Sequence, residues 1–148
     1  LSVLNEARVL DAFAGTGALG LEALSRGAAF AAFAENSRAH AAVLQANIGA
    51  LGLADGLTSV RATAGAFSTE GGFGLILADP PYAQGPAAVA ALLANGGLWH
   101  GETLLVWEGD GETDRSLPGW SLLHEKAVGQ TTFSFHAPES SQDWPAGG

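Results

Sequence analysis

Residues 8–27 read RVLDAFAGTGALGLEALSRG, an apolar run that passes through a glycine-rich turn into a helical pattern. The run at 8–13 predicts a buried strand, and the pattern after it predicts a helix from about Ala18 to Arg26 that Gly27 ends. Glycines allow the backbone to turn tightly, and the first turn of a helix has free N–H groups. A strand, a glycine turn and a helix in this order are typical of α/β folds that bind a ligand at the turn.

Strand and helix patterns alternate through most of the remaining chain. Further strands are predicted at 29–34, 57–62, 73–78 and 103–107. Helices are predicted from Ser37, as N-cap, to Leu51 and from Pro86 to Ala94, with only a short helical turn between the third and fourth strands. Four apolar residues of the longer helix are expected on one side of it: Val43, Leu44, Ile48 and Leu51.

The pattern changes near the C-terminus, where 120–128 and 131–136 are two extended runs joined at Gly129-Gln130. This predicts an antiparallel hairpin. Buried strands that alternate with helices predict a parallel sheet with helices on both faces. The expected fold class is therefore α/β, a mostly parallel sheet with a C-terminal antiparallel hairpin. The tail at 138–148 is rich in Ser, Pro and Gly, and we expect it to be loose.

Composition limits the possible classes of protein. The length of 148 residues suits one domain. With 47% hydrophobic and 14% charged residues, the bulk of the chain is not disordered. There is no cysteine, which excludes a disulfide scaffold and a cysteine nucleophile. The four histidines are far apart in the sequence, so we expect no metal site.

The chain is acidic, with 6 Lys and Arg against 15 Asp and Glu and a net charge of −9. Its cations are scattered, so charge alone disfavours binding to RNA or DNA. No apolar run approaches the ~20 residues that span a bilayer, and we expect no membrane association. The chain has no Met, and its first residues lack the basic start of a signal peptide. We interpret it as a processed or truncated piece of a longer protein.

The glycine turn matches the pattern GxGxxG through Gly15, Gly17 and Gly20, and Glu35 ends the next predicted strand. A carboxylate there can accept hydrogen bonds from two ribose hydroxyls, which predicts a nucleotide-type cofactor. Asp11 lies on the first strand, and a carboxylate aimed at the pocket repels pyrophosphate but suits the amino group of a methionine moiety. This favours S-adenosylmethionine over NAD. The alternative is that Asp11 only hydrogen-bonds the turn.

The fourth predicted strand runs directly into residues 79–82, which read DPPY. Ligands of open α/β sheets bind outside the carboxyl ends of the strands, so this loop and the glycine turn should share one crevice. The Asp79 carboxylate and the Pro80 carbonyl can each accept an N–H from the exocyclic amine of a nucleobase, and Tyr82 can stack on the extruded base. The alternative is that the loop is only a stiff turn.

Four features resemble those of a known family. They are the stretch 11–27, Glu35, the loop 79–82 and the hairpin 120–131, which reads WSLLHEKAVGQT. In combination they are similar to the bacterial 16S ribosomal RNA guanine-N2 methyltransferases of the RsmD type. The resemblance implies a Rossmann-like class I methyltransferase fold over 1–137, with S-adenosylmethionine as the methyl donor. It also implies a cytoplasmic, monomeric enzyme whose partner is ribosomal RNA in the small subunit or its assembly intermediate.

The resemblance also assigns roles by matching position. The residues that it places at the methionine end of the cofactor are Asp11, Phe13, Gly15 and Gly17. Glu35 would hold the ribose and Asn36 would lie at the adenine side. Asp79, with Pro80 and Tyr82, would hold the guanine.

The chain departs from the family pattern in two places. The family has an Asp or Asn after the third strand that contacts the adenine amine, where this chain reads Ala62-Thr63-Ala64-Gly65. Adenine recognition would therefore use Thr63, backbone groups at Ala64 or apolar packing. The family also has a basic hairpin and helix before the first strand, whereas this chain begins at Leu1.

The sequence leaves other functions open. One is methyl transfer to the N6 of a DNA adenine or to a protein glutamine. Another is a cofactor-binding fragment that is inactive without its N-terminal segment. Outside the motifs, we expect Trp107 in the core, and we expect Glu108, Asp110, Glu112 and Asp114 to form a solvated acidic loop.

Overall fold

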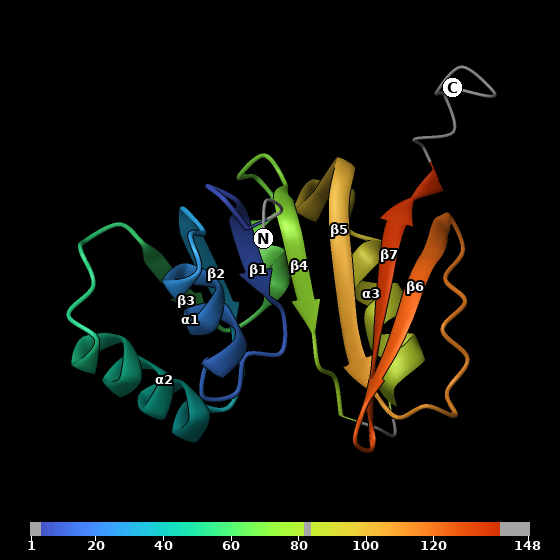
Figure 1. Ribbon diagram of the computed structural model, residues 1–148. Helices are drawn as coiled ribbons and strands as arrows, with labels where there is room; N and C mark the ends of the chain where they lie inside the picture. Colours follow the sequence, from blue (N-terminus) through green and yellow to red (C-terminus); the bar gives the residue numbers. More distant parts are fainter. Residues whose placement is uncertain (1–3, 82–83, 140–148) are drawn as a thin grey trace.

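The computed structural model describes residues 4–81 and 84–139, which form one seven-stranded sheet with helices on both faces (Figure 1). The strands are β1 (Arg8–Asp11), β2 (Phe30–Ala34), β3 (Thr58–Arg61), β4 (Phe73–Ala78), β5 (Trp99–Gly109), β6 (Trp120–Val128) and β7 (Thr131–Pro138). The helices are α1 (Ala18–Ser25), α2 (Arg38–Ala50) and α3 (Gly85–Leu93), with 3₁₀ turns η1 (Ala64–Phe67) and η3 (Gly96–Leu98).

The strand order is β3-β2-β1-β4-β5-β7-β6. Strands β1 to β5 pair in parallel, whereas β7 is antiparallel to both β5 and β6. The predicted fold class, a mostly parallel sheet that ends in an antiparallel hairpin, is therefore confirmed. Because the first five strands run in one direction, their carboxyl ends meet at one edge of the sheet. The order of the strands along the sheet reverses between β1 and β4.

Alternating residues of the central strands face opposite layers. Leu10 and Ile76 belong to a core cluster that includes Val89 of α3, whereas Val9 packs with Ala23 of α1 on the other side. Figure 1 shows α1 and α3 on opposite faces of the sheet. Trp107 is 2% exposed in the α3 layer, which confirms its predicted place in the core.

Helix α2 begins as predicted, because the Ser37 hydroxyl accepts a hydrogen bond from the His40 N–H at 3.2 Å. Only part of its apolar side is buried. Leu44 is fully buried, whereas Val43 is 45% exposed and Leu51 is 57% exposed. Leu44 packs in one cluster with Phe33 of β2, and the partly buried Ile48 of α2 and Val60 of β3 pack against this cluster.

Strand β5 begins at Trp99 and ends at Gly109, beyond both ends of the predicted run at 103–107. Trp99 pairs with Phe73 of β4, and Gly109 pairs with Thr132 of β7, so tertiary pairing extends the strand. Within the two described ranges, no helix combines the length and the apolar character needed to cross a membrane. Of the predicted tail, 140–148 lie outside the described residues.

Gly20 of α1 fills a position where a side chain does not fit. A Cβ atom there would lie 2.4 Å from Cε1 of Phe33, whereas a Cβ at Gly49 of α2 would meet nothing within 4 Å. We expect Gly20→Ala to lower the free energy of unfolding by about 1–3 kcal/mol. The matched variant Gly49→Ala should raise it by about 0.5–1 kcal/mol, because alanine loses less backbone entropy in a helix. Urea denaturation of both variants measures this, and equal effects would contradict the packing described.

Candidate active site

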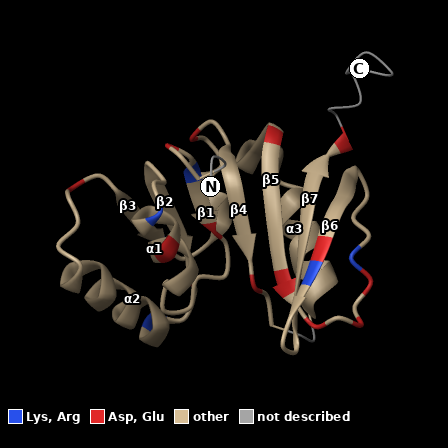
Figure 2. Cartoon of the chain, viewed as in Figure 1, with Lys and Arg blue, Asp and Glu red and all other residues tan. Residues whose placement is uncertain are grey.

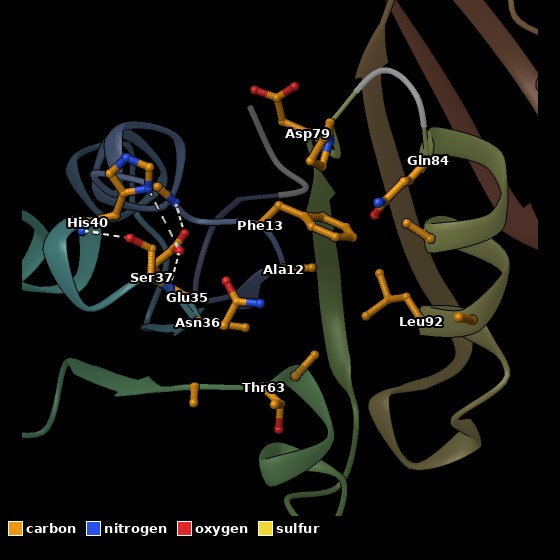
Figure 3. A pocket seen from close by; sticks show the side chains of 17 residues that line it. Ala12, Phe13, Glu35, Asn36, Ser37, His40, Thr63, Asp79, Gln84 and Leu92 are labelled. Carbon is orange, nitrogen blue, oxygen red and sulfur yellow. Dashed lines mark hydrogen bonds and ion pairs between the residues drawn. The ribbon is translucent and has the colours of Figure 1, made fainter.

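A cavity of about 630 Å³ lies at the carboxyl edge of the sheet, between the ends of β1 to β4 and helix α3 (Figure 3). Its wall includes Phe13 and Gly15 from the turn after β1, and Glu35 from the end of β2. Asp79, directly after β4, and Leu92 of α3 line it from the other side. The glycine turn and the DPPY loop thus share one crevice, as the topology predicts.

The carboxylate of Glu35 is held in a fixed orientation by the backbone. Its Oε1 accepts a hydrogen bond from the Gly15 N–H at 2.7 Å, and its Oε2 accepts one from the Ser37 N–H at 2.8 Å. The Nδ1 atom of His40 lies 3.9 Å from Oε2. A carboxylate has about four lone-pair sites, so both oxygens can still accept a hydrogen bond from a ligand.

Asp11 is placed differently from the expectation that it lines the methionine end. Its side chain is 1% exposed, it does not line the cavity, and its Oδ2 accepts a hydrogen bond from the Gly20 N–H at 3.0 Å. This geometry favours the alternative in which Asp11 holds the turn. Burial raises the pKa of Asp11 to about 6, the Gly20 hydrogen bond opposes the shift, and the charges of Asp79 and Glu35 add to it.

Gly15 and Gly17 serve different purposes in the turn. Both have positive φ angles, 56° and 88°. A Cβ at Gly15 would meet nothing within 4 Å, and Gly15 lines the cavity. A Cβ at Gly17 would lie 2.2 Å from Cδ1 of Leu44, and Gly17 is not part of the cavity wall. In this structure, Gly17 allows α2 to pack against the start of α1.

The far end of the cavity is lined by Asn36, Thr63 and Ala64, the residues expected at the adenine side. In Figure 3 the Asn36 carboxamide points into the space between Phe13 and Thr63, whereas the Thr63 hydroxyl points away from it. The polar side chain available at this end is therefore that of Asn36.

The DPPY loop is described only in part. Asp79 lines the cavity, whereas Pro80 is buried and lies beside Gly85 and Trp107. Tyr82, the predicted stacking residue, lies outside the described residues.

Sequence reasoning missed several residues of the wall. Ser37 and His40 line it at the start of α2. Gln84, directly before α3, and Leu92 of α3 line it from the other side. Gln84 follows the DPPY loop almost directly, so its position in the sequence was the available signal. The His40 N–H donates to the Ser37 hydroxyl that caps α2, and the His40 ring lies beside Glu35.

Glu108 does not belong to a solvated loop, and that prediction is wrong. It lies within β5, directly after Trp107, which pairs with Ala78 of β4, so Glu108 is a neighbour of Asp79. Partial burial is the largest cause of a rise in the pKa of Glu108 to about 7, and the charge and hydrogen bond of Asp79 add to it. The sequence signal was hidden, because the extension of β5 depends on its pairing with β7.

Comparison with known proteins identifies the family. The family model described as conserved hypothetical protein 95 matches residues 2–137. Ribosomal RNA small subunit methyltransferase D of Escherichia coli strain K12 is 34% identical over 144 residues, which cover 93% of this chain and 72% of that protein. The chain belongs to the RsmD family.

Solved structures agree with membership of the RsmD family. The structure of yhhF from Escherichia coli is 35% identical, with a TM-score of 0.78, and the match covers 93% of this chain and 80% of that one. A ribosomal protein L11 methylase from Lactobacillus delbrueckii subsp. bulgaricus is 16% identical with a TM-score of 0.72, over 90% and 70% of the two chains, and shows the shared fold. The predicted family, the class I methyltransferase fold and the methyltransferase class of enzyme are confirmed.

The buried Asp11 carboxyl makes stability depend on pH. Its pKa of about 6 lies above the ordinary value of 3.8, so the folded state holds its proton more tightly, and this contribution to stability is lost as pH rises through about 4 to 6. The difference in free energy of unfolding between Asp11→Asn and the parent chain should therefore shift in favour of the variant by about 1–3 kcal/mol from pH 4 to pH 8. Urea denaturation at both pH values measures the difference.

The matched control is Asp55→Asn, at an exposed loop position. It should follow the parent chain at both pH values. A stability difference between Asp11→Asn and the parent that is the same at pH 4 and pH 8 would contradict the buried, proton-binding carboxyl.

Proposed function

We propose that this RsmD-family chain transfers a methyl group from S-adenosylmethionine to the exocyclic N2 of a guanine in small-subunit ribosomal RNA. The observation that carries the proposal is that Gly15 and Glu35, on the cofactor side, line the same cavity as Asp79, on the substrate side. The substrate class follows the relative from Escherichia coli, which is named a ribosomal RNA small subunit methyltransferase.

The chemistry of the cavity wall fits the cofactor. It contains the carboxylates of Glu35 and Asp79, and none of the described residues that line it is Lys or Arg. Such a wall attracts a cation and repels a pyrophosphate, which favours S-adenosylmethionine over a dinucleotide. When bound, S-adenosylmethionine would supply an electrophilic methyl group on a positively charged sulfur.

Each part of the cofactor has a matching part of the wall. Glu35, with one lone pair free on each oxygen, would accept hydrogen bonds from the two ribose hydroxyls. Phe13 and Gly15 would lie against the methionine end. The Asn36 carboxamide would recognise the adenine amine, in place of the acid or amide that the family has after the third strand, and Ala64 would pack on the ring.

Glu35→Gln tests the ribose contact. An amide has one acceptor oxygen, so its NH₂ group would face the N–H of either Gly15 or Ser37 and leave one donor unsatisfied. We expect the affinity for S-adenosylmethionine to fall about 10- to 100-fold in isothermal titration calorimetry. The control is Glu22→Gln, at an exposed position of helix α1 away from the cavity. This variant should bind S-adenosylmethionine like the parent. Unchanged affinity in Glu35→Gln would contradict the assigned role.

Asp79 and Pro80 would act on the substrate amine. The nitrogen lone pair of guanine N2 is delocalised into the ring, so the amine is a poor nucleophile. If the Asp79 carboxylate and the Pro80 carbonyl each accept one N–H, the lone pair is directed towards the cofactor side of the cavity. Positive charge that develops on the nitrogen is then stabilised by Asp79. Tyr82 would stack on the extruded guanine.

Asp79→Ala separates the two halves of the site. We expect methyl transfer to fall about 100- to 1000-fold, because one acceptor and its charge are removed, while the affinity for S-adenosylmethionine changes little. Transfer is measured with unmethylated small subunits, protein-free 16S RNA, DNA and a glutamine-containing protein, so the same assay identifies the substrate class.

The exposed loop variant Asp55→Ala is the matched control and should transfer at the rate of the parent chain. Equal loss of transfer and of cofactor binding in Asp79→Ala would contradict the assignment of Asp79 to the substrate. Transfer to DNA or protein in preference to RNA would overturn the proposed substrate.

The charges favour a second candidate, in which this chain binds the cofactor but needs another basic element to hold RNA. Figure 2 shows few Lys and Arg residues among many acidic ones. Arg8 and Arg61 lie 3.5 and 3.3 Å from the carboxylate of Glu70, and Arg115 is buried. Few cations therefore remain to neutralise phosphates. Cofactor binding without transfer, restored by adding a basic RNA-binding segment, would favour this candidate.

A further inference from the structure

A second carboxyl group lies beside Asp79, outside the cavity already described. Strands β4 and β5 are parallel, with Ala78 level with Trp107, so the next residues along each strand, Asp79 and Glu108, are neighbours at the carboxyl edge. Figure 2 shows acidic residues where these two strands end. Residues that are level with each other on neighbouring parallel strands face the same side of the sheet, so the register brings the two carboxyl groups together.

Two carboxyl groups can share a hydrogen bond only when one of them carries a proton. Glu108 is partly buried between β4 and β7, level with Phe133, whereas Asp79 is exposed at the cavity. Burial favours the neutral form, so the proton resides on Glu108. The pKa of Glu108 is raised to about 7, which agrees with this assignment.

Other charged groups near Glu108 do not replace this proton. On β1, Asp11 adds further negative charge. After β5, Asp110 accepts hydrogen bonds from its own loop, and the guanidinium of Arg115 donates to carbonyl oxygens and to Ser134. Lys126 of β6 is level with Phe133 and is separated from Glu108 by β7. Asp79 is thus the described carboxylate that the register places beside Glu108.

We propose that Glu108 is a positioning residue for methyl transfer, whose protonated carboxyl group donates a hydrogen bond to one oxygen of Asp79 and leaves the other for the substrate amine. This inference rests on the proposed function, because it needs Asp79 to bind the amine. The proton also keeps two adjacent carboxylates from both being charged. When Glu108 loses it, the hydrogen bond is lost and the two anions repel, so Asp79 leaves its place.

The consequence is a specific pH dependence. Glu108 is protonated below its pKa, so kcat/KM of the parent chain should be steady below pH 7 and fall up to about 10-fold per pH unit above it. In Glu108→Gln the amide donates to Asp79 at every pH, so this fall should disappear between pH 6.5 and pH 9. In Glu108→Ala, kcat/KM should be lower throughout by about 10-fold or more, because a hydrogen bond to a charged group is absent.

A measurement on the free protein tests the pair without methyl transfer. In ¹³C NMR of protein labelled at the glutamate carboxyls, one signal should titrate with a midpoint near pH 7 and be absent in Glu108→Gln. In Asp79→Asn its midpoint should fall by one pH unit or more, because the neighbouring charge is removed. The control Glu112→Gln, at an exposed position in the loop after β5, should retain the signal, its midpoint and the parent pH profile.

The outcomes separate this inference from the proposed function. A Glu108 midpoint near the ordinary value of 4.5, or a fall in kcat/KM above pH 7 that persists in Glu108→Gln, overturns the inference even if RNA is methylated. A shared proton seen by NMR in a parent chain that methylates no RNA overturns the proposed function and the positioning role, while the hydrogen-bonded pair stands. Calorimetry with S-adenosylmethionine should show equal affinity for Glu108→Gln and the parent, and this confirms that the variant is folded.

Discussion

The repulsion among four carboxyl groups, brought together by the parallel strands, is the constraint on which this site depends. Four neighbouring strands place these groups at or beside their carboxyl ends, at one edge of the sheet: Asp11, Glu35, Asp79 and Glu108. The structure relieves the repulsion in different ways. Glu35 accepts hydrogen bonds from two backbone N–H groups, and Asp11 accepts one and has a raised pKa. Partial burial beside Asp79 raises the pKa of Glu108. A bound cation would relieve what remains, which is why a sulfonium cofactor suits the cavity.

The backbone that holds these groups is positioned by close packing rather than by the ligand. Phe33 lies under the start of α1, where Gly20 leaves room for its ring, and Leu44 of α2 occupies the space that Gly17 leaves. These contacts hold the glycine turn in place, and the turn positions the Gly15 N–H to donate to Glu35. Preorganised donors and acceptors of this kind bind a ligand without first having to be ordered.

Much of the fold and part of the site follow from sequence, because periodicity and turn residues are local signals. The strand, glycine turn and helix at 8–27 and the hairpin at 120–136 are predicted correctly, and the common crevice of Gly15 and Asp79 follows from the direction of the strands. What is missed depends on tertiary contacts. The purpose of Gly17 is set by Leu44, far along the chain, and the environment of Glu108 is set by the pairing of β5 with β7. A row of charged residues does not reveal such pairing.

In the proposed function, one cavity holds the donor between Glu35 and Asp79. A crystal structure of the chain with S-adenosylmethionine tests this placement. It should show both ribose hydroxyls within hydrogen-bond distance of the Glu35 carboxylate and the methyl group on the side of the cavity that faces Asp79. A ribose bound away from Glu35, or a methyl group that points away from Asp79, would contradict the claim.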